Sequence, residues 1–422
     1  MLTGSVKNTY LAILQEELIP ATGCTEPIAI AYCAAKLREV LGAAPELIYA
    51  EISGNLIKNA KSVTVPNTNG MKGIEAAIAA GIVAGDPTKE LEVIANATEE
   101  QRKAMADYLK TVKIEVTCPE TPLLLDMRLT GIHGGDKAVV RIANTHTNVV
   151  HIEKNGVVQL DKPASQADYA TDRSCLNVRD ILEFANTVEA EKLRPLVGRQ
   201  IEYNLKIAED GLQNPWGATI GQILLREYGD DVKIKAKAYA AAASDARMNG
   251  CERPVIILSG SGNQGITSSM PVVQYAKHLG VGEEKMLRAV AVSDLITVHL
   301  KSGIGRLSAF CGAVAAGAGA GGGIAYLLDG SYEAVSSTVS NALGMISGTI
   351  CDGAKSSCAA KIMSSVEAGI IGYQMYKQNK EFAGGEGIIG CDVEKTIQNI
   401  GVLAKQGMYE TDRVILGIMT QS

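Results

Sequence analysis

Basic character is absent from this sequence, both as a net charge and as a local run. The 422 residues carry 40 Lys and Arg against 46 Asp and Glu, which gives a formal charge of −6 at pH 7. A surface that binds nucleic acid through its phosphates needs clustered Lys and Arg. We therefore expect no nucleic-acid partner and a small molecule as the ligand.

The pattern of an export signal is also missing. The first 20 residues, MLTGSVKNTYLAILQEELIP, predict an amphipathic helix ended by Pro20 and have no apolar core followed by a small-residue cleavage site. The long uncharged stretch 310–328 is mostly Gly and Ala, which favours close helix packing over insertion into a bilayer. We expect a cytoplasmic protein that does not enter a membrane and whose nine cysteines stay reduced.

Several motifs of common enzyme classes do not occur. The glycine-rich segment 259–271 contains no GxxxxGK[ST], and none of the five histidines lies in HExxH. No activated lysine with a phosphate cup supports a pyridoxal enzyme, so we expect no pyridoxal phosphate. His133, His146 and His151 fall in a strand-rich region and are interpreted as structural. His299 either borders a site together with Lys301 or ends a solvated helix.

The residue patterns that are present predict an α+β fold. Residues 1–165 are expected to form a mixed α/β domain with a small multi-stranded sheet, and residues 166–422 a mostly all-α domain. In the first domain, helices are predicted at 5–18, 26–41, 71–84 and 98–109, and strands at 46–53 and 61–65. Four further strands are predicted from the runs VKIEVTC, LLLDMRLTG, KAVVRIANT and NVVHIEK.

Three cysteines near the C-terminus are set among glycines. Cys311 lies in LSAFCGAVAAGAG, and Cys351 and Cys358 lie in GTICDGAKSSC. Thiolates are the preferred ligands of iron–sulfur clusters. A cysteine can equally pack in a core as a small hydrophobe, and the spacing of Cys351 and Cys358 is not that of CxxC sites. A turn at Asp352-Gly353 would bring this pair closer, and the residues alone leave both interpretations open.

Two further segments are candidates for chemistry. Cys24, in ATGCTEP, precedes a predicted helix, whose amide dipoles would lower the pKa of its thiol. It either serves as a base or is a small residue in a tight turn. The segment SGSGNQGITSSMP (259–271) either holds a carboxylate or phosphate, with Asn263 and Gln264 adding hydrogen bonds, or is a helix–helix turn.

Taken together, the motifs resemble a known family. PATGCTEPIAIA, SGNLIKNAKSVTVP, SGSGNQGITSSMPV, LSAFCGAVAAGAG and GTICDGAKSSC are similar, over almost the whole chain, to the L-cysteine desulfidase family, which is related to the alpha chain of iron–sulfur L-serine dehydratases. The resemblance implies that Cys311, Cys351 and Cys358 hold a 4Fe-4S cluster, which can be lost in aerobic samples, and that Cys24 is catalytic. The short spacing of the cysteine pair resembles the desulfidase branch more closely.

The activity implied by the resemblance is iron–sulfur-dependent α,β-elimination of L-cysteine to pyruvate, ammonia and sulfide. Besides Cys24, the expected substrate-binding residues are Asn263, Gln264 and Gly265 at the carboxylate and Asn55, Asn59 and Lys301 at the rim. A homodimer is expected. Two other functions stay open, an L-serine dehydratase of the same chemistry and a noncatalytic protein that binds an amino acid or a metal.

Overall fold

The first part of the chain forms a sheet covered by helices, as the sequence predicts. The computed structural model describes residues 2–164 and 170–421, so the predicted boundary between 165 and 166 lies outside the described residues. The sheet has the order β3-β2-β4-β5-β6-β7, and only β2 and β3 are parallel neighbours. Its strands are β2 (Leu47–Ile52), β3 (Lys113–Thr117), β4 (Asp126–His133), β5 (Asp136–Ala143), β6 (Val149–Lys154) and β7 (Val157–Asp161).

Apolar helices cover this sheet in layers. Helix α2 (Thr25–Leu41) is buried almost all round because it packs on β4 and β5 on one side and on α4 (Gly73–Ala84) on the other. The α2–α4 contact needs a glycine, since a Cβ at Gly81 would lie 2.0 Å from the Ala31 carbonyl oxygen. The remaining helices here are α3 (Gly54–Ala60), α5 (Glu99–Thr111) and the 3-10 helix Pro87–Glu92.

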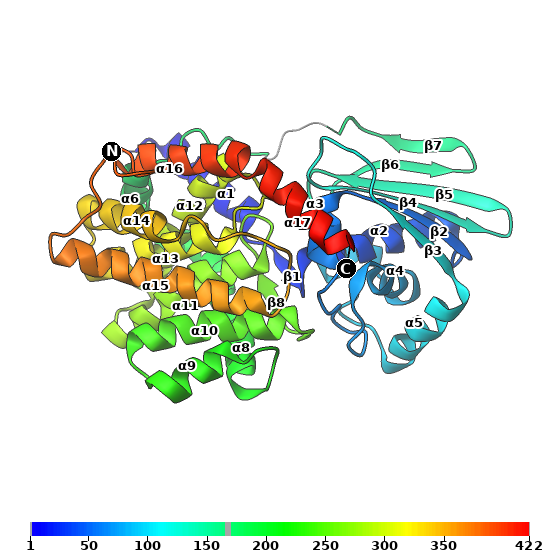
Figure 1. The fold of residues 1–422 in the computed structure, drawn as a ribbon, viewed down its shortest axis with the longest axis horizontal. Helices are drawn as coiled ribbons and strands as arrows, with labels where there is room; N and C mark the ends of the chain where they lie inside the picture. Colours follow the sequence, from blue (N-terminus) through cyan, green and yellow to red (C-terminus); the bar gives the residue numbers. More distant parts are fainter. Residues whose placement is uncertain (1, 165–169, 422) are drawn as a thin grey trace.

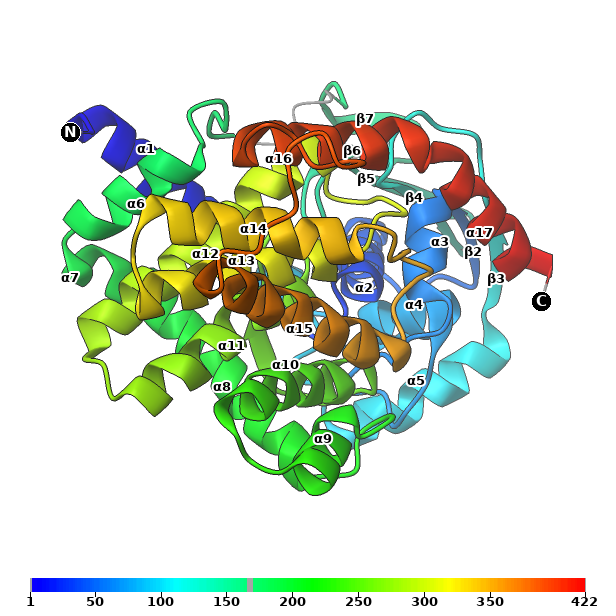
Figure 2. The same ribbon diagram turned by 60° about the vertical axis from the view of Figure 1, so that its left-hand side comes forward.

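The second part of the chain is a helical bundle around one glycine-rich helix, α13 (Gly312–Leu328), which contacts α11, α12, α14 and α15 (Figure 2). Its small residues let the neighbouring helices approach closely, as the composition of 310–328 predicts. The other helices are α6 (Val178–Thr187), α7 (Ala190–Leu193), α8 (Arg199–Gln213), α9 (Ile220–Tyr228), α10 (Val232–Met248), α11 (Gly262–Leu279), α12 (Glu283–Ile304), α14 (Tyr332–Ile346), α15 (Ser357–Lys377), α16 (Val393–Val402) and α17 (Tyr409–Gln421), with π-helical turns at Arg194–Gly198 and Leu403–Gly407. No helix among the described residues combines the length and apolar composition needed to cross a membrane.

Both ends of the chain cross between the two parts (Figure 1). Helix α1 (Gly4–Glu17) packs in the helical part, where the Tyr10 ring meets Phe184 edge-on at 5.3 Å between centroids. Strand β1 (Pro20–Thr22) then pairs with β8 (Pro254–Ile256) of that part. At the other end, α17 lies against α3, and the ammonium of Lys58 pairs with Asp412.

The structure corrects two local predictions. Residues 61–65 do not form a strand. Their β-branched side chains lie in a turn, in which Thr64 makes a single bridge to Lys72. The segment 259–271 is mostly helix, because α11 begins at Gly262 and continues through Pro271. The predicted helices 5–18 and 26–41 are confirmed as α1 and α2, and the four later strand runs as β3 to β6.

A buried acid in the helical core predicts how stability depends on pH. Asp294 is fully buried, and its Oδ1 accepts hydrogen bonds from Gln200 Nε2 at 3.0 Å and Ser268 Oγ at 2.7 Å. Its Oδ2 has no hydrogen-bond partner in the part of the chain that the structure describes. Burial raises the pKa of Asp294 to about 7, from an ordinary value of 3.8. Between these two pH values the folded protein keeps a proton that the unfolded chain releases, so stability falls as the pH rises.

We expect Asp294→Asn to remove this part of the pH dependence, which is on the order of 4 kcal/mol across that range. Urea unfolding at pH 4 to 8 measures it. Asp107→Asn, at an exposed carboxylate on α5, is the matched control and should leave the slope unchanged. Equal slopes in the Asp294→Asn variant and the unaltered protein would contradict the prediction.

Candidate active site

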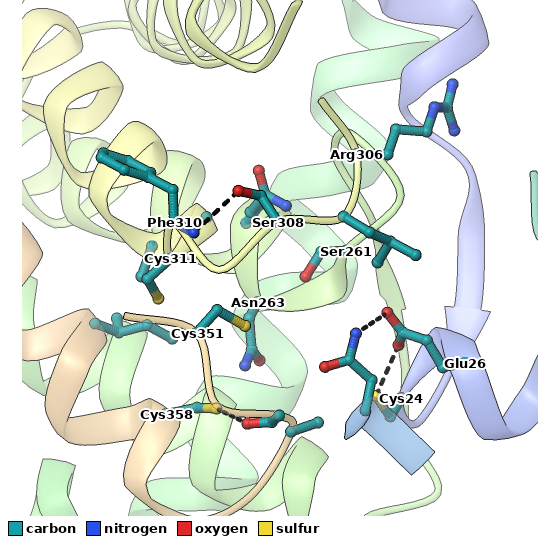
Figure 3. Close-up of a pocket in the computed structure, with 18 of the residues that line it drawn as sticks. Cys24, Glu26, Ser261, Asn263, Arg306, Ser308, Phe310, Cys311, Cys351 and Cys358 are labelled. Atoms are coloured by element: carbon teal, nitrogen blue, oxygen red, sulfur yellow. Dashed lines mark hydrogen bonds between the residues drawn. The ribbon is translucent and has the colours of Figure 1, made fainter. Parts of the chain in front are cut away.

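A cavity of about 100 Å³ lies where the helices next to the sheet meet the helical bundle. Helices α2 and α3 line one side, and α10, α11, the segment 301–313 and the start of α15 line the other. Figure 3 shows the sulfurs of Cys311, Cys351 and Cys358 on one side and Cys24 with Glu26 on the other, with Asn263 between them. The lining residues are Cys24, Glu26, Asn59, Arg247, Ser261, Asn263, Gln264, Lys301, Arg306, Leu307, Ser308, Phe310, Cys311, Gly312, Ala313, Cys351, Gly353, Ala354, Cys358 and Ile362.

Helix packing explains why Cys311 and Cys358 meet. Cys311 is the N-cap of α13 and Cys358 lies in the first turn of α15. The two helices touch at two points that are four residues apart along each helix. A Cβ at Gly317 would lie 2.5 Å from the Ser365 carbonyl oxygen, and one at Gly321 would lie 2.7 Å from Gly369 Cα. The helices are therefore parallel and in register, and both begin at the same end of the bundle.

Cys351 is brought to this end by backbone hydrogen bonds. Phe310 and Ile350 form an antiparallel bridge, in which the Cys311 amide donates to Thr349 and the Cys351 amide donates to Ala309. The chain then turns through Gly353, whose φ of +94° suits glycine, and the Cys358 sulfur lies 3.8 Å from the Gly353 carbonyl oxygen. The chain bends at Ala354-Lys355, directly after the Asp352-Gly353 dipeptide at which the sequence suggested a turn.

The three thiols act on one another electrostatically. Burial, together with the charges that Cys351 and Cys358 would carry as thiolates, raises the pKa of Cys311 to about 12. Burial and the Cys351 charge also raise the pKa of Cys358. Burial lowers the pKa of Lys301 to about 8, against the opposing effect of Cys351 and Cys311. Three adjacent thiolates without a counterion would repel, so this donor set suits a cation that neutralises it.

The donor set fits a cluster better than a single ion. Among the described residues, no group of three or more His, Cys, Asp or Glu is arranged to hold one metal ion. In an iron–sulfur cluster each cysteine binds its own iron, so the sulfurs need to surround a volume and not a point. Cys311, Cys351 and Cys358 on one cavity wall could hold such a group.

Cys24 lies opposite, at the start of α2. It is the N-cap residue of this helix, and its thiol donates to Glu26 Oε2 at 3.1 Å. The predicted lowering of the thiol pKa is wrong. Burial raises the pKa of Cys24 well above its ordinary value, and the Glu26 charge raises it further, against the opposing effect of Arg247. Cys24 is therefore a protonated thiol bound to a carboxylate at neutral pH.

Glu26 is a functional candidate that the sequence did not single out. Burial alone would raise its pKa, but the His146 imidazole, whose Nε2 lies 4.0 Å from Oε1, and the Cys24 thiol lower it to about 2. Asn59 Nδ2 donates to Oε1 at 3.1 Å, and the Thr25 hydroxyl lies 3.0 Å from Oε2. Glu26 is thus a charged acceptor inside the cavity. The adjacent Pro27 marks the helix start, but the sequence gives no sign of the buried partners.

The other predicted site residues divide into two groups. Asn59, Asn263, Gln264 and Lys301 line the cavity. Asn55 and Gly265 are not among the described residues that line it. Asn55 is half-buried at the start of α3, and Gly265 lies inside α11, where a Cβ would meet the Ile256 carbonyl oxygen at 2.1 Å. Packing therefore explains the glycine.

The structure also shows where His146 and His299 lie relative to the cavity. His146, interpreted as structural, is buried beside Glu26. His299 does not border the cavity with Lys301, because its Nε2 lies 2.6 Å from Glu394 of α16.

The sequence is similar to one protein family and to several bacterial proteins. The sequence profile described as serine dehydratase alpha chain matches residues 88–417. The UPF0597 protein of Desulfitobacterium hafniense is 55% identical over 416 residues, which cover 97% of this chain and 96% of that protein. The UPF0597 proteins of Treponema denticola and Lachnoclostridium phytofermentans are 50% identical over 418 residues and 51% identical over 408 residues. These alignments cover 97% and 96% of this chain and 97% and 98% of the respective relatives.

The turn between Cys351 and Cys358 can be tested by one substitution. A Cβ at Gly353 would lie 2.2 Å from the Lys58 carbonyl oxygen of α3, and the φ of +94° disfavours any other residue. We expect Gly353→Ala to lower the free energy of unfolding by about 2–3 kcal/mol in urea titrations. Gly348→Ala, where a Cβ would have open space, should change it by less than about 0.5 kcal/mol. Equal effects would refute this account of the turn.

Proposed function

The chain belongs to the serine dehydratase alpha-chain family, and we propose that it is an iron–sulfur lyase that converts L-cysteine and water into pyruvate, ammonia and sulfide. Membership in this family supports a lyase of amino acids. The observation that carries the finer proposal is that three thiols able to hold a cluster face a fourth thiol paired with a carboxylate across one small cavity. Elimination needs these two elements, an acceptor for the α proton and a group that stabilises the departing β substituent.

Cys311, Cys351 and Cys358 would hold a 4Fe-4S cluster. When bound by three protein ligands, such a cluster supplies an open iron that acts as a Lewis acid on the leaving group. The ammonium of Lys301 is close enough to Cys311 and Cys351 for their charges to affect its pKa, so it offsets part of the negative charge on this wall. The wall is otherwise apolar where Phe310 and Ile362 line it, which limits the access of water.

The α proton would be taken by the pair of Cys24 and Glu26. Since the thiol is protonated and hydrogen-bonded to the carboxylate, Cys24 can accept a proton only after passing its own to Glu26. The ionised carboxylate can receive this proton, but Asn59 and His146 stabilise its charged form, so the transfer is uphill and leaves Cys24 as a strongly basic thiolate. The substrate loses its α proton to this pair and sulfide from the β carbon. The resulting aminoacrylate tautomerises and is hydrolysed to pyruvate and ammonia.

Leaving-group chemistry favours cysteine over serine. A thiolate binds iron and departs without prior protonation, whereas hydroxide is a poorer leaving group that needs an acid. None of the described residues that line the cavity is a histidine, and His146 faces Glu26, with its Nε2 4.0 Å from Oε1. An L-serine dehydratase is the second candidate, favoured by the family name alone. A homodimer and a cytoplasmic location stay predictions.

The division of roles between the thiols predicts different losses in two variants. Cys24→Ala should keep the iron content and visible absorption of anaerobically reconstituted protein, while kcat falls by about 10²-fold to 10⁴-fold because the proton acceptor is broken. Cys351→Ala should lose iron and turnover together. Iron and sulfide analysis with a pyruvate assay measures both effects.

The control for these variants is Cys118→Ala, which removes an exposed thiol. It should leave iron content and turnover unchanged. Equal iron loss in Cys24→Ala and Cys351→Ala would make Cys24 a ligand and would refute its role as base. Absence of both iron and turnover from the anaerobic, unaltered protein would favour a noncatalytic binding protein.

Substrate choice gives an independent prediction. The cluster-loaded protein should show a higher kcat/KM for L-cysteine, measured as equal amounts of sulfide and pyruvate, than for L-serine, measured as pyruvate. Better turnover of L-serine would assign the protein to the dehydratases.

A further inference from the structure

Arg247 is a buried cation in the cavity without a matching anion. It lies in the last turn of α10, and only 2% of its surface is exposed. Its Nη1 donates to Asn263 Oδ1 at 3.1 Å, which is a neutral partner. Its Nε and Nη2 are buried and have no hydrogen-bond partner among the described residues. A buried charge is costly unless it is paired and its donors are hydrogen-bonded, so this guanidinium favours a negatively charged ligand.

The anionic groups around the cavity are engaged elsewhere. Glu26, the one carboxylate among the described lining residues, is bound by Cys24 and Asn59. The second arginine of the cavity, Arg306, has carboxylates beside it, because its Nη2 lies 3.7 Å from Glu17 and 4.0 Å from Glu16. Of the two guanidinium groups, only that of Arg247 lacks an ion pair with a carboxylate among the described residues.

The position of Arg247 matches the proposed chemistry. The next residue, Met248, packs with Cys24 and Val63 in one small buried cluster, and the Arg247 charge lowers the pKa of the Cys24 thiol. A ligand anion on Arg247 would thus lie on the Cys24 side of the cavity. In an α-amino acid the carboxylate is bonded to the α carbon, so this placement brings the α proton toward the proposed acceptor.

The local backbone is shaped to admit the guanidinium. A Cβ at Gly262 would lie 2.3 Å from Arg247 Nε and 2.7 Å from its Cζ, so any other residue at this position would displace the group. A second unpartnered atom, Gln264 Oε1, is an acceptor that lines the same cavity. The donors of the Arg247 guanidinium fit the carboxylate of a zwitterion, and the Gln264 acceptor fits its ammonium group.

We propose that Arg247, positioned by Asn263 and Gly262, binds the α-carboxylate of the substrate and restricts the site to free α-amino acids. A planar guanidinium can hold a carboxylate with two parallel hydrogen bonds, which a lysine cannot do. This inference rests on the proposed function for the identity of the substrate. Asn263 then positions the arginine and does not hold the carboxylate itself.

Two cysteine analogues test the assignment in the cluster-loaded protein. 3-Mercaptopropionate keeps the carboxylate and lacks the amine, while cysteamine keeps the amine and lacks the carboxylate. In Arg247→Lys and Arg247→Gln the KM for L-cysteine and the inhibition constant of 3-mercaptopropionate should both rise by about 100-fold. Inhibition by cysteamine and the iron content should not change. Equal weakening of both inhibitors, or of neither, would overturn the proposal.

A second measurement avoids both the cluster and a buried substitution of the arginine. Iron-free, unaltered protein should bind L-alanine but not ethylamine, its counterpart without a carboxylate, in isothermal titration calorimetry. Gly262→Ala, which keeps Arg247 and displaces its guanidinium, should abolish the L-alanine signal, while Gly348→Ala should retain it. Binding of ethylamine as tight as that of L-alanine would overturn the assignment. Because this titration needs neither iron nor turnover, it can succeed or fail independently of the proposed elimination.

Discussion

The site depends on one packing constraint, the close approach of two helix backbones where one of them carries glycine. Where α13 meets α15, Gly317 and Gly321 face Ser365 and Gly369, and a Cβ at either glycine would collide with the opposite helix. This contact fixes the two helices in parallel, so their first turns lie side by side. Cys311 is the N-cap of α13 and Cys358 lies in the first turn of α15. Their convergence therefore follows from the glycine contacts later in the two helices.

Much of the architecture could be predicted because it is local. The apolar periodicity of 26–41 and the β-branched runs of 112–154 determine elements that need little help from distant contacts. The run at 61–65 failed for the opposite reason, because the turn after α3 and the bridge to Lys72 overrode its β-propensity. The three cysteines could be proposed as a set from their residue type and setting, but their convergence required the helix register.

The chemistry of the cavity was predicted less well, since it arises between segments. At Cys24, the helix N-terminus stabilises the thiolate by about 0.3–1 kcal/mol, which lowers the thiol pKa by less than about one unit. Full burial can raise a thiol pKa by about 3–5 units, so the effect of burial prevails. Glu26 and His146 meet across 120 positions of sequence that carry no common pattern. Arg247, in the helical run SDARM, has the appearance of an ordinary surface residue in the sequence, and only the fold shows that it is enclosed.

Each end of the chain packs against the part formed by the other end, and this limits how the two parts can recombine with other proteins. Strand β1 completes a pair with β8 in the helical part, and α17 returns from that part to α3. Either portion, encoded by itself, would therefore contain an element whose partner belongs to the other. The two portions are not exchangeable modules, and a recombination event that joined one of them to a foreign partner would leave an unpaired strand and an uncovered helix.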